Sequence, residues 1–295
     1  MKKLLITGAS GFLGWHLCQL AKQEYDVYGT YFSHSVQIPG TTTIKANLTD
    51  FQDLKQVLSD IKPTAVIHTA ALSQPNFCQM HPHESHAINV EASCNISGLC
   101  ADASIPCVFT STDLVFDGLN APYRETDSVS PVNIYGEHKV MAEKGMLERY
   151  PMTAVCRMPL MFGMATPTAI SFIQPFIQTL KEGKDLNLFI DEFRTPVSAK
   201  TAAKGLLLAL DKVQGYIHLG GKERISRYDF GLLMAEVFQL SSSQIKASRQ
   251  QDVKMAAPRP SDVSLDSSKA FALGYEPLCL REELAIATRR VWGWR

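Results

Sequence analysis

The sequence predicts an α/β protein built on a doubly wound parallel sheet of the Rossmann type. Short apolar runs at 4–7, 64–68 and 107–111 alternate with segments of helical period, which is typical of buried parallel strands and the helices that cover them. Evenly spaced glycines join the first run to the first helix. Small and hydroxyl-bearing residues follow the later runs, at the strand ends where open α/β sheets bind ligands.

Composition narrows the class of protein. The 295-residue chain has 29 basic and 29 acidic residues, so its formal net charge is zero. This balance argues against nucleic acid or a membrane surface as the partner, and no segment has the length of a membrane span. The apolar run after Lys2 and Lys3 is too short for a signal peptide. Seven cysteines without a C-x-x-C pair indicate free thiols, so we expect a reduced, cytoplasmic protein.

The glycine-rich stretch at 8–14 predicts a phosphate-binding turn. A strand that turns directly into a helix points the free N–H groups and the positive end of that helix at one place, which suits a phosphate. Gly8 would make the tight turn, Gly11 would let a pyrophosphate approach the backbone, and Gly14 would let helix and strand pack closely. A plain strand-to-helix turn is the alternative.

The second strand, expected at 25–31, bears on the choice of cofactor. An acidic residue at its end would accept hydrogen bonds from the adenosine ribose, but the chain has none there. This favours NADP, with Ser33 and His34 as candidate contacts of the 2′-phosphate, while NAD stays possible. Residues 47–50 are expected to cap a helix at 51–59.

The stretch 78–86 combines Cys78 with three histidines, His81, His83 and His86. Such a tract can mark a zinc site. However, Pro82 is expected to break any helix here, and the spacing fits no common zinc pattern. We therefore expect a polar loop without a metal, followed by a helix at about 84–101.

The second half of the chain is interrupted by prolines and predicts a second, smaller unit. A helix at 198–210 and a strand at 215–219 are expected to return to the sheet. We thus expect a dinucleotide-binding domain of residues 1–157 with 198–220, and a substrate lobe of residues 158–197 and 221–295. Trp292 and Trp294 are expected to be packing or interface residues.

Tyr135 and Lys139 are the predicted acid–base pair. They lie one turn apart on an expected helix at 135–149 and therefore share a face. A free phenol has a pKa of about 10, and a neighbouring ammonium favours the phenolate. A hydroxyl of the stretch 110–113, at the preceding strand end, would lie beside the phenol and donate to a substrate carbonyl. A surface tyrosine beside a solvated lysine is the alternative.

These motifs resemble a known family. Thr7-Gly8-x-x-Gly11-x-x-Gly14, the strand-end Ser111-Thr112 and Tyr135-x-x-x-Lys139 are similar to the extended short-chain dehydrogenase/reductases. The stretches STDLVFDG at 111–118 and PVNIYG at 131–136 resemble the dTDP-4-dehydrorhamnose reductase family more narrowly. The resemblance continues through Ala70-Ala71-Leu72, Ile88-Asn89-Val90, Arg157-Met158-Pro159 and Arg259-Pro260.

The resemblance implies a role for each group of site residues. The catalytic residues would be Thr112, Tyr135 and Lys139, the last also gripping the nicotinamide ribose. The pyrophosphate would be held by Gly8, Ser10, Gly11, Phe12, Leu13 and Gly14. Adenine would contact Asn47 and Leu48, and the path to nicotinamide would be lined by Ala70, Ala71 and Leu72. The substrate would face Ser73, Gln74, Thr112 and Asp113. A homodimer is possible, because the Tyr135 helix often forms dimer contacts in relatives.

The predicted function is an NAD(P)H-dependent reductase of a keto group on a nucleotide-activated sugar, with the proton coming from Tyr135. The family usually has Tyr where Leu114 stands, often Asp at Asn47 and an aromatic residue at Leu160, so the sugar or carbonyl compound stays open. An NAD-dependent epimerase is one alternative; a dehydratase would need an acid at Leu114. A cofactor-binding regulatory subunit is another, as in the β subunit of methionine adenosyltransferase, a relative of this reductase family.

Overall fold

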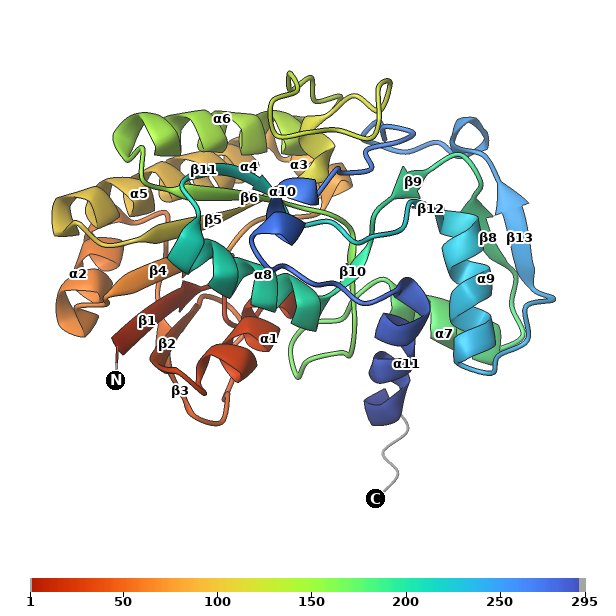
Figure 1. The fold of residues 1–295 in the computed structure, drawn as a ribbon, viewed down its shortest axis with the longest axis horizontal. Helices are drawn as coiled ribbons and strands as arrows, with labels where there is room; N and C mark the ends of the chain where they lie inside the picture. The colour runs from red at the N-terminus through yellow and green to blue at the C-terminus, as the bar shows by residue number, and fades with distance from the viewer. Residues whose placement is uncertain (1, 292–295) are drawn as a thin grey trace.

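Seven parallel strands form one central sheet in the computed structural model, which describes residues 2–291 (Figure 1). Their order in space is β11-β6-β5-β4-β1-β2-β3. They are β1 (Lys2–Thr7), β2 (Tyr25–Tyr31), β3 (Thr41–Lys45), β4 (Ala65–His68), β5 (Cys107–Thr112), β6 (Ala154–Met158) and β11 (Gly215–His218). Because the chain starts inside the sheet and winds outward in both directions, the expected Rossmann-type α/β fold is confirmed.

Helices cover both faces of this sheet. On one face, α1 (Phe12–Ala21) and α8 (Ala199–Lys212) pack over Leu4 and Ile6 of β1. The other face carries Leu5, and it is covered by α2 (Phe51–Ile61), α5 (Ala92–Ala103) and α6 (Ile134–Arg149). Successive side chains of β1 thus enter opposite cores, because side chains alternate across a strand.

A further apolar cluster lies beside the sheet, at the right of Figure 1. It buries Phe162, Leu188, Phe230 and Leu284 among others. The elements around it are α7 (Ile173–Lys181), β8 (Leu186–Phe189), β9 (Phe193–Arg194), β12 (Ile225–Ser226), α9 (Arg227–Val237), β13 (Ile245–Ser248) and α11 (Leu280–Val291). We call this part the lobe. β8 pairs with β13, and β9 pairs with β12. The division of the chain into two domains stays a prediction, and Trp292 and Trp294 lie outside the described residues.

Short elements complete the chain. β7 (Met161–Phe162) pairs with β10 (Val197–Ser198) between the sheet and the lobe. The other short helices are α3 (Pro75–Met80), α4 (Pro82–His86), α10 (Ser268–Ala272), a π-helical turn (Ala87–Glu91) and two 3-10 turns (Asp113–Val115 and Gln250–Asp252). Asp50 caps α2 as expected, since its side chain accepts hydrogen bonds from the N–H groups of Gln52 and Asp53.

The expectation of a loop at 78–86 was wrong. All of it except His81 lies in α3 and α4; the helix is interrupted before Pro82 as expected, and Pro82 then occupies the first turn of α4. Proline is tolerated there because the first N–H groups of a helix have no partner within it. The single helix expected at 84–101 is likewise divided by the π-helical turn.

Three further observations concern the described residues. None of their helices is long and apolar enough to cross a membrane. Within the same residues, no group of three or more His, Cys, Asp or Glu is placed to hold a metal ion. All seven cysteines are free thiols, and only Cys279 is not buried.

Candidate active site

A cleft of about 1350 Å³ runs along the carboxyl ends of β1 to β6 and continues against the lobe. With the exception of His34, every residue predicted for the site lines it. These residues are Gly8, Ser10, Gly11, Phe12, Leu13, Gly14, Ser33, Asn47, Leu48, Ala70, Ala71, Leu72, Ser73, Gln74, Thr112, Asp113, Tyr135 and Lys139. The fold therefore brings together segments that lie far apart in the sequence.

The glycine turn after β1 forms a compact cradle. Gly8 has a φ of +73°, a conformation that side chains disfavour, and a Cβ on it would lie 2.7 Å from the Ala70 Cα. A Cβ on Gly14 would collide with the Gly8 carbonyl oxygen, so α1 packs tightly against the turn. Gly11 begins α1 without any side-chain cap. The first N–H groups of α1 are thus left for a ligand, and this cradle fits a pyrophosphate.

The residues after β2 and β3 form the far end of the cleft. Ser33 lines it, whereas the exposed His34 does not and instead lies with its Nδ1 3.0 Å from the Ser33 hydroxyl. The role of His34 in phosphate binding stays a prediction. Asn47 and Leu48 lie at the same end. The Asn47 side chain accepts hydrogen bonds from both the N–H and the hydroxyl of Thr49.

Buried polar side chains hold the loop after β4 in place. Asn89, in the π-helical turn, bonds both the N–H and the C=O of Leu72. His68 lies 2.6 Å from the Thr7 hydroxyl and 2.9 Å from the Ser93 hydroxyl. Burial and, to a smaller extent, the Lys139 charge lower the pKa of His68 to about 3. A neutral His68 therefore connects β1, β4 and α5.

Tyr135 lies at the start of α6, beside the end of β5. Asn133 caps this helix by accepting a hydrogen bond from the Gly136 N–H at 2.9 Å. A Cβ on Gly136 would collide with the Leu114 carbonyl oxygen, so the helix start lies directly against the strand end. Burial raises the pKa of Tyr135 well above its ordinary value, and the neighbouring Thr112 hydroxyl opposes this effect.

Lys139 is 1% exposed, and its Nζ lies 4.3 Å from the centre of the Phe109 ring. Burial lowers the pKa of Lys139 to about 7, while Glu143, one turn further along α6, raises it. Both Glu143 carboxylate oxygens accept hydrogen bonds from Arg157, at 3.0 and 2.9 Å. The charges that act on the Tyr135 pKa are those of Asp113 and Cys78, so the expected pull of the Lys139 ammonium is not seen among the described residues.

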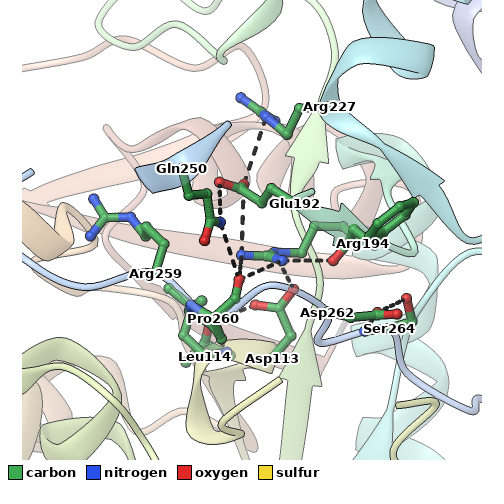
Figure 2. Close-up of polar contacts among 12 residues, drawn as sticks. Asp113, Leu114, Glu192, Arg194, Arg227, Gln250, Arg259, Pro260, Asp262 and Ser264 are labelled. Atoms are coloured by element: carbon green, nitrogen blue, oxygen red, sulfur yellow. Dashed lines mark hydrogen bonds and ion pairs between the residues drawn. The ribbon is translucent and has the colours of Figure 1, made fainter. Parts of the chain in front are cut away.

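The lobe contributes charged side chains that the sequence patterns missed. Figure 2 shows Asp113, Arg194, Glu192 and Arg227 as a row of alternating charges. The Nε of Arg194 lies 3.6 Å from Asp113 Oδ2, and Glu192 Oε1 lies 3.6 Å from Arg194 and 3.8 Å from Arg227. Burial raises the pKa of Asp113 to about 6, against the lowering effect of Arg194.

Arg227 and Arg259 add positive charge at the lobe side of the cleft. The Arg227 guanidinium lies 4.2 Å from the centre of the Phe172 ring, and burial lowers the pKa of Arg227 to about 10. Arg259 donates to the Ala257 carbonyl at 2.8 Å. In the sequence, the resemblance at Arg259-Pro260 was the observation that pointed to the lobe side of the cleft. Three guanidiniums around one cleft suit a ligand that carries negative charge.

Known proteins resemble this chain over nearly its whole length. The family model described as "RmlD substrate binding domain" matches residues 1–291. Methionine adenosyltransferase 2 subunit beta of Xenopus laevis is 30% identical over 281 residues, which are 92% of this chain and 83% of that protein. A hypothetical dTDP-4-dehydrorhamnose reductase from Sulfolobus tokodaii has a TM-score of 0.83 at 33% identity, covering 92% of this chain and 94% of its own.

A third comparison concerns the fold alone. The dTDP-4-dehydrorhamnose reductase of Bacillus anthracis str. Ames, solved in complex with NADP, has a TM-score of 0.87 at 21% identity. The match covers 97% of this chain and 99% of that one. The likeness therefore extends over both the sheet and the lobe.

Proposed function

Because the chain belongs to the RmlD substrate binding domain family, we propose that it is an NAD(P)H-dependent reductase of a keto group on a nucleotide-activated sugar. One observation carries the proposal. Tyr135 and Thr112, at the end of β5, both line the cleft that begins at the glycine turn, and Thr112 is close enough to the phenol to lower its pKa. An acid and a hydroxyl are thereby placed where a carbonyl beside a dinucleotide would lie.

The glycine cradle would hold the cofactor through its pyrophosphate, with Ala70, Ala71 and Leu72 along the path to the nicotinamide. When bound, the nicotinamide supplies the hydride. NADP is the expected form, since no carboxylate stands at the end of β2 and Ser33 lines the cleft there. The NADP complex of the Bacillus anthracis reductase, which shares this fold, supports the same expectation.

Tyr135 would act as the proton donor. Because burial raises its pKa above that of a free phenol, Tyr135 carries its proton at neutral pH and can give it to the alkoxide that forms at the reduced carbon. Thr112 would hold the carbonyl oxygen in place. Lys139 would grip the nicotinamide ribose.

The lobe would hold the nucleotide part of the substrate. Arg227 and Arg259 lie in the cleft and offer charge-assisted hydrogen bonds to a diphosphate. Leu114 and Leu160 line the same cleft, where the family usually has rings, so the sugar would meet an apolar wall of aliphatic side chains.

A panel of nucleotide-linked 4-keto sugars, each mixed with NADPH or NADH, tests the proposal. We expect oxidation of NADPH, followed by its absorbance, with at least one of these sugars and not with the corresponding sugars that lack a keto group. A protein that binds NADPH tightly but oxidises it with none of the sugars would contradict the reductase proposal.

A second candidate is a regulatory subunit that binds the cofactor without turning it over. The likeness to methionine adenosyltransferase 2 subunit beta favours it. Mixing the purified chain with a methionine adenosyltransferase catalytic subunit and measuring complex formation by sedimentation separates the two. Stable association without NADPH oxidation would support the regulatory subunit, and oxidation without association would support the reductase.

A further inference from the structure

A loop of residues 163–171, which we call the strap, leads from β7 to α7 and reaches the glycine turn. Its two ends are tied together. The Gly163 carbonyl accepts hydrogen bonds from the Ser171 hydroxyl at 3.1 Å and from the Gln174 side chain at 2.7 Å. The strap is therefore a closed loop whose ends lie close to each other.

The tip of the strap is a turn held by its own hydrogen bonds. The Thr166 hydroxyl oxygen accepts from the Ala169 N–H at 2.8 Å and from the Thr168 N–H at 3.3 Å. The Thr166 N–H donates to the Ala169 carbonyl at 2.7 Å. Threonine side chains stabilise turns through such local bonds. Thr168 is thus presented by a turn whose backbone is already fixed.

Two hydrogen bonds join the strap to the start of the chain. The Thr168 hydroxyl donates to the Ser10 carbonyl at 2.6 Å. The Met164 carbonyl accepts from His16 Nε2 at 3.1 Å; a carbonyl can only accept, so this nitrogen carries the proton. Ser10 belongs to the glycine turn and His16 to α1. The strap therefore contacts both parts of the cradle.

The Ser10 carbonyl belongs to the peptide group that joins the turn to α1. In the described part of the chain, Thr168 is the one donor to this carbonyl. At the other end of the same peptide group, the Gly11 N–H donates to the Gly8 carbonyl at 2.9 Å. Because a peptide group is planar, a bond at each end fixes its orientation.

Gly11 is the reason why the second bond is needed. Glycine rotates about its backbone bonds more freely than other residues, so the Gly8 bond alone leaves the peptide group free to rotate. The N–H groups of Phe12 and Leu13 follow directly, and within residues 2–291 no carbonyl accepts from them. Rotation of the Ser10–Gly11 peptide would turn these N–H groups away from a phosphate.

We propose that Thr168 is a positioning residue of the dinucleotide site: its hydroxyl, brought by the strap, fixes the Ser10–Gly11 peptide so that the first N–H groups of α1 face the pyrophosphate. The proposal rests on the proposed function for its cofactor. It gives a part of the cofactor site to a segment that lies outside the sheet and outside the glycine motif.

The affinity for NADPH, measured by fluorescence titration without any sugar, tests the proposal. Thr168→Val keeps the shape of the side chain and removes the hydroxyl, so the dissociation constant should rise about 5- to 10-fold. Thr168→Ser keeps the hydroxyl and should bind NADPH almost as tightly as the wild type. Thr179→Val is the matched control, because the Thr179 hydroxyl donates to the Pro175 carbonyl within α7. Its dissociation constant should be unchanged.

Adenosine 2′-monophosphate shows where the effect arises. This ligand has the adenosine and the 2′-phosphate of NADPH but no pyrophosphate. Its dissociation constant should therefore be the same in Thr168→Val and in the wild type. An equal loss of affinity for NADPH and for adenosine 2′-monophosphate would show a general distortion of the cleft and would overturn the proposal.

Hydrogen exchange in the protein without cofactor reports on the peptide group itself. The Gly11 amide should exchange faster in Thr168→Val than in the wild type, whereas the amides of β4 should exchange as before. Faster exchange of both would indicate a loss of overall stability and would count against a positioning role. The same measurement on Thr168→Ser should give the wild-type rate at Gly11.

His16→Phe provides a second variant, so a poorly folded Thr168→Val would not decide the outcome alone. It keeps a ring and removes the donor to Met164, which loosens the strap at its other contact, and NADPH binding should weaken. An NADPH affinity that is unchanged in both variants would overturn the proposal, even if the wild type reduces a sugar. A wild type that binds NADPH but reduces no sugar would end the proposed function and leave this test in force.

Discussion

Asn89 holds both backbone polar groups of Leu72: its Oδ1 accepts from the Leu72 N–H at 3.0 Å, and its Nδ2 donates to the Leu72 carbonyl at 3.0 Å. Asn89 is fully buried and lies in the π-helical turn. π-helical turns are often found at functional sites. Here the turn places one amide so that it fixes the loop over which the nicotinamide would lie.

Asn89→Ala should therefore destabilise the protein and loosen the cofactor site. The N–H and C=O groups of the half-buried Leu72 lose their partner, which costs about 2 kcal/mol of unfolding free energy. Denaturant unfolding measures this loss, and a titration with NADPH should show weaker binding. Asn95→Ala is the control, because Asn95 contacts the exposed Arg149, and its change should be about 0.5 kcal/mol or less. Equal losses in the two variants would count against the role of Asn89.

Tyr135→Phe should abolish most turnover and spare cofactor binding. The substitution removes the acid but keeps the ring, so kcat should fall by about 10²- to 10⁴-fold. Single-turnover kinetics and NADPH binding are the measurements. Tyr150→Phe, at the end of the same helix, should leave kcat unchanged. Undiminished hydride transfer in Tyr135→Phe would remove Tyr135 from the mechanism.

Lys139→Met should raise thermal stability while it lowers turnover and cofactor affinity. Burial lowers the pKa of Lys139 from 10.5 to about 7. Between these pH values the unfolded chain binds a proton that the folded protein does not, so this group makes wild-type stability rise with pH and costs stability below pH 7. At pH 7, Lys139→Met should melt a few degrees higher, since about 1 kcal/mol corresponds to roughly 2–4 °C in a chain of this size.

The same variant makes a prediction about pH. The gain in melting temperature of Lys139→Met over the wild type should shrink between pH 7 and pH 10. Lys144→Met, at an exposed position of the same helix, should show neither the gain nor the trend. A Lys139→Met protein that binds NADPH normally would contradict the proposed grip on the ribose.

Gly14→Ala should destabilise the protein and weaken cofactor binding, because the added Cβ would collide with the Gly8 carbonyl oxygen in the cradle. Gly98→Ala in α5 is the matched control, since the nearest side-chain atom to its added Cβ is 4.0 Å away. It should gain about 0.5–1 kcal/mol from helix propensity. Circular-dichroism melts and NADPH titrations of both variants check this. A Gly14→Ala protein as stable as Gly98→Ala would show that the cradle is not tightly packed.

The parts that could be predicted from the sequence depend on local patterns. Apolar runs identified the strands of the sheet, and helical periods identified the helices that cover it, because each of these elements buries apolar side chains in the core. The glycine turn could be predicted because its three glycines lie within seven residues of one another. Tyr135 and Lys139 could be predicted as a pair because residues four apart on a helix share a face.

The missed parts depend on contacts between distant segments. Arg194 and Glu192 reach Asp113 only because the lobe folds back over the end of β5, and no period or motif encodes that approach. Sequence reasoning placed Asp113 toward the substrate without its arginine. The loop expected at 78–86 was wrong for another reason: Pro82 interrupts the helix at His81, but a proline is also accepted in a first turn, so a new helix starts there.

The late position of β11 in the chain has a consequence for synthesis on the ribosome. β6 emerges early, but its outer neighbour β11 follows only after the whole of 159–214 has been made. Until then, β6 exposes a row of unpaired N–H and C=O groups, which can pair with a strand of another nascent chain. The sheet is therefore completed by a segment that is translated after much of the lobe.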